Sequence, residues 1–195
     1  MDKDKFYIRF TITLVALVLI CFLIVMPKRA YAEINPNQKA VDYSVEFYEM
    51  WTHDTKNSQK MTYMDYRAIT NTHSNQYKFQ QRDDVWVDEY GFLVQNSEWY
   101  VVAMGSYWGE IGDKFIIRLE NGETISCVLG DIKADRHTDK NNYAHETDGH
   151  VVEFLIDSSS PYMKQVGMSK YGLVNKVFKQ FDSKIVGICK VEEKW

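Results

Sequence analysis

The fold that we predict for this chain of 195 residues rests on residues 100–157. They begin with Tyr-Val-Val-Ala-Met-Gly at 100–105 and end with Gly-His-Val-Val-Glu-Phe-Leu-Ile-Asp at 149–157. Both runs are short, apolar and rich in β-branched or aromatic residues, which is typical of buried strands. Between them, an Asn-Gly pair at 121–122 predicts a hairpin, and a loop rich in Asp and His follows it.

Two registers are open to this hairpin. With a two-residue loop, Ile117 would face Ser126 across the pair of strands. With a three-residue loop that ends in a left-handed Gly122, Ile117 instead faces Ile125. The second register buries more apolar surface, and we therefore expect it.

The body of the chain carries several short strands with tight turns and little helix. Such a pattern is typical of a small barrel, which closes its own edges. We expect strands at 84–88, 100–104, 114–120, just after the hairpin turn, 151–156 and 184–191, with a helix at 161–180.

The N-terminus carries an apolar run of 17 residues at 10–26, flanked by basic residues on both sides. Its length lies between the core of a signal peptide and the roughly 20 residues that span a bilayer. Ala-Tyr-Ala at 30–32 fits a cleavage site, but Lys28 and Arg29 are unusual for one. Residues 1–32 are therefore either a signal peptide cleaved near Ala32 or a retained transmembrane anchor, and either places the body outside the cytoplasm.

Residues 33–81 are expected to form a helical and irregular connecting region, and residues 82–195 the barrel domain. Ala40, Tyr43, Phe47 and Trp51 recur at three- and four-residue steps, which predicts a helix at 38–56. A second, short helix is expected at 61–69.

Charge and cysteine content exclude several classes of function. The net charge of −4 comes without a basic stripe, so we expect no nucleic-acid partner. No Cys-x-x-Cys pair and no phosphate-cradling Gly-rich loop occur, so we expect no cofactor. Outside the cytoplasm, Cys127 and Cys189 are either a disulfide or two buried free thiols.

Three motifs carry a resemblance to a known family. They are Glu-Ile-Gly-Asp at 110–113, Gly-Asp-Ile-Lys at 130–133 and Gly-His-Val-Val-Glu at 149–153. In this order they resemble the double-psi beta-barrel "three-aspartate" domain of membrane-bound lytic transglycosylases and Gram-positive cell-wall proteins. The resemblance covers about residues 100–191 and implies a mainly β fold, a small six-stranded double-psi-like β-barrel.

The chain also departs from the family pattern. The family's Gly-Gly after the first acid is absent, an insert at about 136–148 lengthens the interval to the second acid, and Glu153 stands where the family has Asp. The resemblance therefore bears on the fold more strongly than on the activity.

As the resemblance implies, a lytic transglycosylase protonates the leaving oxygen of a glycan bond, and the sugar's own 6-hydroxyl attacks. The acid must stay protonated near neutral pH, which burial or a neighbouring carboxylate brings about. Asp131 and Glu153 are our candidates for this pair, with Glu153 as the acid. The alternative is that Glu153 points to solvent from an alternating strand.

Aromatic and histidine side chains beside the acids are candidates for contact with sugar rings. Tyr107 and Trp108 lie at glycine-bounded turns and can stack on a glycan, and His150 immediately precedes the strand of Glu153. Packing in the core or at its rim is the alternative role for the two aromatic residues.

The loop after the hairpin offers a metal site as an alternative, since oxygen and imidazole ligands suit divalent ions. We otherwise expect no metal, because Asp- and His-rich loops are commonly solvated surface. The candidate ligands are Asp135, His137, Asp139 and His145.

Two hypotheses on function follow. The first is a cell-wall-associated enzyme outside the cytoplasm that cleaves peptidoglycan glycan strands. The second is a membrane-anchored accessory module that binds glycan or a surface protein without catalysis. The first requires residues 100–191 to close around a cleft that brings the two acids together.

Overall fold

The computed structural model describes residues 43–48 and 60–193, and side chains are described within 60–191. The predicted N-terminal segment at 1–32 lies outside these residues. No helix among the described residues has the length and apolar character needed to cross a membrane.

Residues 42–195 form one compact unit, and its described part is mainly β, as predicted. Two short α-helices accompany the strands: α2 (Asn75–Gln80) and α3 (Pro161–Gln165). The ten strands are β1 (Tyr43–Tyr48), β2 (Thr62–Asp65), β3 (Val85–Val87), β4 (Leu93–Gln95), β5 (Trp99–Met104), β6 (Lys114–Leu119), β7 (Thr124–Ile132), β8 (Glu153–Ile156), β9 (Tyr171–Leu173) and β10 (Ile185–Glu193).

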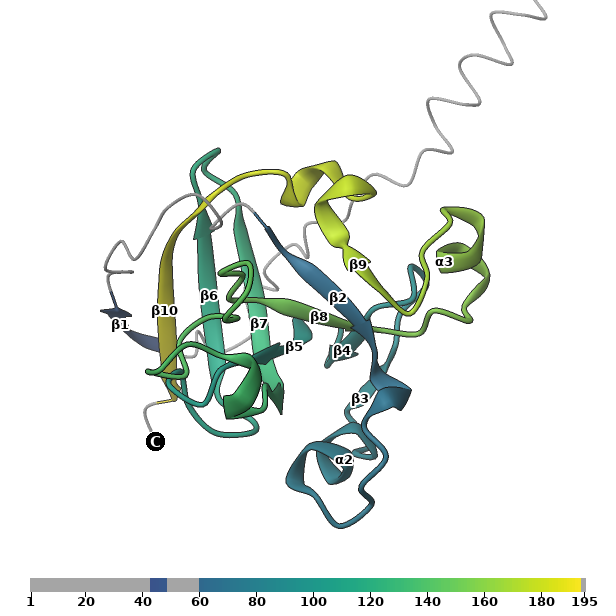
Figure 1. Cartoon of the computed structure of the whole chain (residues 1–195), viewed down its shortest axis with the longest axis horizontal. Helices are drawn as coiled ribbons and strands as arrows, with labels where there is room; N and C mark the ends of the chain where they lie inside the picture. The colour runs from purple at the N-terminus through teal and green to yellow at the C-terminus, as the bar shows by residue number, and fades with distance from the viewer. Residues whose placement is uncertain (1–42, 49–59, 194–195) are drawn as a thin grey trace, which may run out of the picture. The chain divides into compact units, whose positions relative to one another are not determined.

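The strands form an open sheet in the order β1-β10-β6-β7-β5-β8-β2-β9, with β3 and β4 paired at one side (Figure 1). The prediction of a closed six-stranded barrel is therefore wrong for the described strands. Closure of the predicted strands would require β8 to pair with β10. Instead, β2 occupies the outer edge of β8 and β1 occupies that of β10.

The hairpin of β6 and β7 has the predicted register. Ile117 lies opposite Ile125, and Gly122 has a left-handed φ of 88°. The parallel pairing of β7 with β5 continues from this hairpin and is interrupted by a bulge at Gly130. A side chain at Gly130 would overlap Val101, so glycine allows the two strands to approach.

The predicted helices are wrong at three places. Residues 43–48 form β1, which pairs with β10 in antiparallel fashion, and 61–69 contain β2 and a short 3-10 helix at Tyr66–Ala68. At 161–180 the helix α3 ends after five residues, and left-handed Gly167 then redirects the chain toward β9. Gly172 in β9 leaves room for the ring of Tyr63 from β2, so pairing in the sheet replaces the expected helix.

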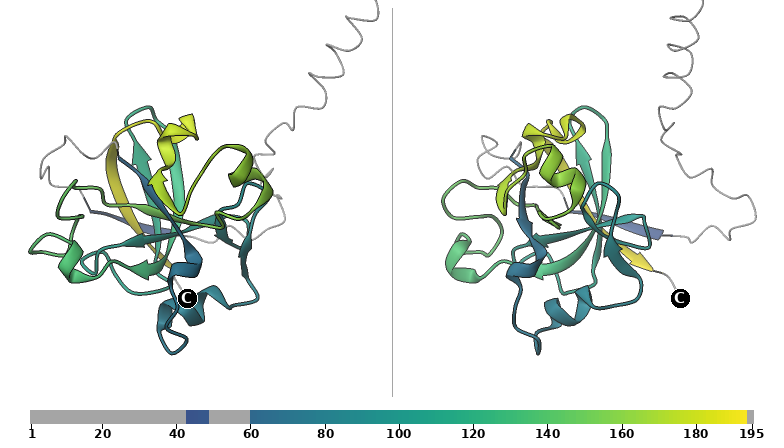
Figure 2. Two further views of the ribbon diagram at one scale, coloured as in Figure 1. Left: turned by 45° about the vertical axis from the view of Figure 1, so that its right-hand side comes forward. Right: turned by 90° about the vertical axis from the view of Figure 1, so that its right-hand side faces the viewer.

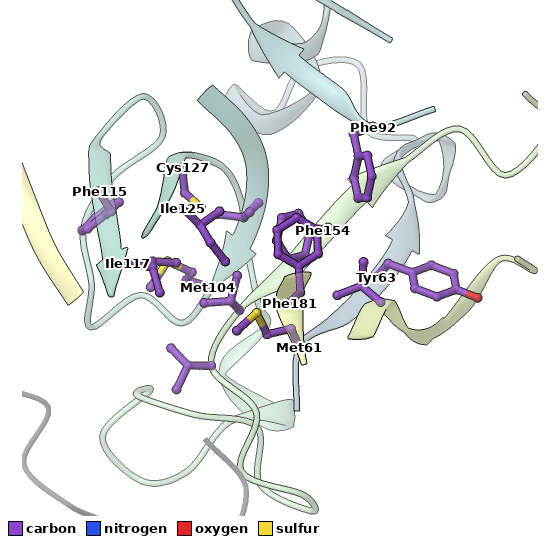
Figure 3. Close-up of a cluster of buried hydrophobic side chains, with 14 of the residues drawn as sticks. Met61, Tyr63, Phe92, Met104, Phe115, Ile117, Ile125, Cys127, Phe154 and Phe181 are labelled. Atoms are coloured by element: carbon purple, nitrogen blue, oxygen red, sulfur yellow. The ribbon is translucent and has the colours of Figure 1, made fainter. Parts of the chain in front are cut away.

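The larger hydrophobic core lies against one side of this sheet and is rich in aromatic rings. Figure 3 shows Phe154 and Phe181 stacked, with ring centroids 5.0 Å apart, and Phe92 beside them. Cys127 belongs to this cluster, and both Cys127 and Cys189 are buried free thiols. Burial raises the pKa of each thiol, so both act as small apolar side chains.

Asp65, at the end of β2, ties that strand to the chain after β8. Its buried carboxylate accepts hydrogen bonds from the backbone N–H of Arg67 at 3.0 Å and of Ser158 at 3.1 Å. Burial alone would raise the pKa of Asp65, but these bonds and the Arg67 guanidinium hold it well below its usual range. The carboxylate of Asp65 therefore fixes the end of β2 beside the end of β8.

Candidate acidic site on β5, β7 and β8

The sheet brings Asp131 and Glu153 to the two sides of one residue. Ala103 in β5 is paired with Asp131 in β7 and with Glu153 in β8. Because neighbouring strands lie about 4.8 Å apart, the Cα atoms of the two acids are separated by about 10 Å. The predicted neighbours are thus brought together by strand pairing in an open sheet and not by barrel closure.

The fold raises the pKa of the Asp131 carboxyl. This carboxyl is half-buried, and the backbone N–H of Ile132 and the charge of Lys133 act to lower its pKa against the effect of burial. Burial, together with the negative charge of Glu153, raises the pKa of Asp131 to about 6. A carboxyl group of this kind keeps its proton in mildly acidic solution and can act as an acid there.

Lys133 is a residue of this site that the sequence analysis missed. It is 7% exposed, and its Nζ has no hydrogen-bond partner within the described part of the chain. Burial lowers the pKa of Lys133 to about 8, against the opposing charges of Glu153, Asp148 and Asp131. Lys133 follows Asp131 by two residues, so on an extended strand both side chains point to the same face, and this spacing could have indicated it.

The loop between β7 and β8 adds a cluster of His145, Asp148 and His150 beside Lys133. One oxygen of Asp148 lies 2.5 Å from Nδ1 of His150 and 3.0 Å from Nδ1 of His145. The two imidazole rings stack, with centroids 4.6 Å apart. Burial and the charge of Lys133 lower the pKa of His150 to about 4, although Asp148 acts in the opposite direction, and His150 is therefore neutral at pH 7.

This loop is anchored to the end of β5. A side chain at Gly105 would overlap the carbonyl oxygen of Asn142, so only glycine allows the loop to approach β5 so closely. The backbone N–H of Tyr107 donates a hydrogen bond to that same carbonyl oxygen at 3.2 Å. In both views of Figure 2 the green loop between β7 and β8 stands out from the strands.

The four metal ligands proposed from the sequence are not gathered in one place. Asp139 uses its carboxylate to accept hydrogen bonds from the backbone N–H groups of Asn141 and Tyr143, and so shapes the loop. His137 is exposed and accepts from Arg136. Of the proposed set, His145 alone belongs to the close His-Asp-His cluster found among the described residues.

The two aromatic candidates for glycan contact differ in exposure. Tyr107 is 54% exposed, whereas Trp108 is buried and donates its indole N–H to the carbonyl oxygen of Tyr143 at 3.0 Å. Tyr107 makes an edge contact with both of these rings. Trp108 is therefore part of the packing, and Tyr107 is the ring that a ligand can reach.

His150 is a buried residue of the loop between β7 and β8, so direct contact with a substrate does not follow from its position. An open groove of about 660 Å³ lies elsewhere, along α2, with Phe79, Lys78 and Arg82 on one side and Ile111 on the other. Ile132, the neighbour of Asp131, also lines this groove. Neither acid of the candidate site lines this groove.

The chain was also compared with known proteins. No protein-family model, curated protein sequence or solved structure matches the chain.

Proposed function

We propose that this protein works outside the cytoplasm at the cell wall and cleaves peptidoglycan glycan strands in the manner of a lytic transglycosylase. The observation that carries the proposal is the pairing of Asp131 and Glu153 on either side of Ala103, with the pKa of Asp131 raised to about 6. The sequence-based prediction of this activity required barrel closure, which the open sheet of the described strands does not provide, so the proposal now rests on the strand pairing of the two acids alone.

In this mechanism Asp131 donates its proton to the oxygen of the bond between the two sugars. The C–O bond breaks as the 6-hydroxyl of the same sugar attacks the anomeric carbon, and the hydroxyl proton passes to the carboxylate of Asp131. The negative charge of Glu153 stabilises the positive charge that develops on the sugar ring. We assign the proton donor to Asp131, in place of the sequence-based choice of Glu153, because burial raises the pKa of Asp131.

The test is muropeptide analysis of peptidoglycan treated with the purified full-length chain. We expect products that end in a 1,6-anhydro sugar, lighter by one water than products of hydrolysis. Asp131→Asn should abolish these products, Glu153→Gln should lower their yield by about 100-fold or more, and Asp135→Asn, in the adjacent exposed turn, should leave the yield unchanged. Absence of anhydro products from the unaltered chain, or an unchanged yield from Asp131→Asn, would remove the assignment.

A glycan-binding module without catalysis is the second candidate, and the exposure of Tyr107 favours it. An exposed ring over buried Trp108 and half-buried Tyr143 is a rigid platform on which a sugar can stack. In a sedimentation assay with insoluble peptidoglycan, Tyr107→Ala should weaken binding. Tyr171→Ala, which removes an exposed ring on β9, should have no effect.

The two candidates predict different outcomes for one pair of variants. If the protein binds but does not cleave, Tyr107→Ala lowers sedimentation and Asp131→Asn changes nothing. If it cleaves, Asp131→Asn eliminates the anhydro products and leaves the sedimentation of the chain intact.

The location outside the cytoplasm is proposed from the apolar run at 10–26 and its basic flanks. A protease added to intact cells freed of their wall should digest the body of a retained, anchored chain. Recovery of a chain that begins near Glu33 from the culture medium would indicate cleavage, and a chain protected in the cell interior would refute both alternatives.

A further inference from the structure

We propose that His145, Asp148 and His150 bind one divalent ion of the borderline class, of which Zn²⁺ matches the donor set best. The proposal rests on the cluster alone and is independent of any activity on glycans. It differs from the four ligands expected from the sequence, because Asp148 and His150 join His145 in place of Asp135, His137 and Asp139.

The positions of the donor atoms suit a metal ion. One donor atom from each of the three residues lies within 4.8 Å of the others. At bond lengths of about 2.1 Å, tetrahedral zinc holds neighbouring ligand atoms about 3.4 Å apart. The Nδ1–oxygen distances from Asp148, 2.5 Å to His150 and 3.0 Å to His145, need to open by less than about 1 Å to reach that value.

The chemistry of the donors points to the same class of ion. Two imidazole nitrogens and one carboxylate oxygen are ligands of zinc and similar ions, whereas calcium and magnesium prefer oxygen alone. Three protein ligands leave a fourth position for water. Asp148 lies close to both imidazoles, yet Nδ1 of His145 makes no hydrogen bond within the described part of the chain. An ion between the three groups would satisfy this nitrogen.

The ring of His150 is the buried member of the cluster, and Lys133 lies near it. Its side chain is 6% exposed, and its Nε2 has no hydrogen-bond partner among the described residues. The nitrogen of His150 that faces Asp148 is Nδ1, so the unsatisfied Nε2 is not the proposed ligand atom, and its burial is a cost of placing the ring here. Lys133 lies close enough to oppose a cation, but the carboxylates of Asp131 and Glu153 lie within its reach and compensate its charge.

The backbone holds the three ligands in a tight turn. The N–H of His145 donates to the carbonyl of His150 at 3.0 Å, and the N–H of Gly149 donates to that of His145 at 2.8 Å. Gly149 has a left-handed φ of 69°, which lets the chain reverse between Asp148 and His150. The side chains of His145 and Asp148 are 29% and 30% exposed, so an ion can enter from solvent.

The test uses the full-length chain purified without a histidine tag and dialysed against a chelator. Titration with Zn²⁺ in a calorimeter, with metal content measured by mass spectrometry, should show an equivalent of zinc that requires the cluster. Asp148→Asn and His150→Gln should each weaken that binding by at least about 100-fold, because each removes a ligand. His137→Gln, in the same loop but outside the cluster, should bind as the unaltered chain does.

His145→Gln guards against loss of fold, because His145 is only half-buried. It should weaken zinc binding while the circular dichroism spectrum stays that of the unaltered chain. Cobalt provides a second readout, since Co²⁺ in a tetrahedral site absorbs visible light, and this absorption should vanish in His145→Gln. Failure of the unaltered chain to bind zinc, or binding by His145→Gln and Asp148→Asn equal to that of the unaltered chain, would overturn the proposal.

Discussion

Replacing Asp131 with asparagine should stabilise the protein, and more so as the pH rises. The unaltered carboxyl has a pKa of about 6 in the fold against an ordinary value of 3.8. Between these two values the unfolded chain loses its proton first, so the stability of the unaltered protein falls as the pH rises through this window. The asparagine side chain in Asp131→Asn carries no proton to lose in this range of pH.

The size of the effect follows from the two pKa values. At about 1.4 kcal/mol per pKa unit, the difference corresponds to about 3 kcal/mol. Because Asp131 is only half-buried, solvent screening reduces this to about 1–2 kcal/mol. The difference in free energy of unfolding between Asp131→Asn and the unaltered chain should therefore be about 1–2 kcal/mol larger at pH 8 than at pH 3.5.

The assay is urea unfolding of the full-length chain, followed by near-ultraviolet circular dichroism at several pH values. Comparing the two proteins at each pH cancels the titration of all other groups. Asp135→Asn, in the exposed turn nearby, is the matched control for replacing a carboxyl with an amide. A difference for Asp131→Asn that stays constant from pH 3.5 to 8 would refute the claim that the fold disfavours the ionised carboxyl.

Three further changes test the surroundings of the site. Lys133→Met removes a positive charge that favours ionised Asp131, so the pKa of Asp131 should rise further above 6, as measured by carboxyl NMR titration. Asp65→Ala removes the hydrogen bonds that Asp65 accepts from Arg67 and should lower the free energy of unfolding by about 3 kcal/mol in urea at pH 7. The fold lowers the pKa of Asp65 below its ordinary value of 3.8, so its carboxylate stabilises the unaltered chain fully above pH 3.8. This stabilisation is lost as the pH falls through the folded pKa, and the effect of Asp65→Ala should shrink accordingly. Gly105→Ala should displace the loop between β7 and β8 and cost about 1–3 kcal/mol, visible as a lower melting temperature and shifted histidine NMR signals.

Local patterns in the sequence predicted local structure well. Asn121-Gly122 and the apolar residues on both sides contain all the information that sets the hairpin register, and Ile117 does face Ile125. The strands at β5, β8 and β10 also occur where the apolar runs predict them. Each of these elements is specified by residues close to one another in the chain.

Pairings between distant segments could not be predicted in the same way. Apolar residues at 40–51 recur at helical spacing, yet Tyr43, Val45 and Phe47 also alternate, and the edge of β10 selects the strand. The same edge, once occupied by β1, prevents the closure on which the barrel prediction depended. Neither β1 nor β8 alone contains the information on which of them pairs with the edge of β10.

The catalytic role of the two acids stays a prediction, but their placement can be compared with the structure. Asp131 and Glu153 were selected as a pair, and the sheet does align them on Ala103. Lys133 was missed because a lysine in a polar loop sequence is ordinarily at the surface. Its burial beside Asp148 and Glu153 arises from residues distant in the chain.

The most direct test of the account is the titration of the Asp131 carboxyl carbon by NMR, in the unaltered chain and in Glu153→Gln. The account predicts a pKa near 6 in the unaltered chain, and a lower pKa in Glu153→Gln because the repelling negative charge is gone. A pKa near the ordinary value of 3.8 that does not respond to Glu153→Gln would show that the two acids do not share a site.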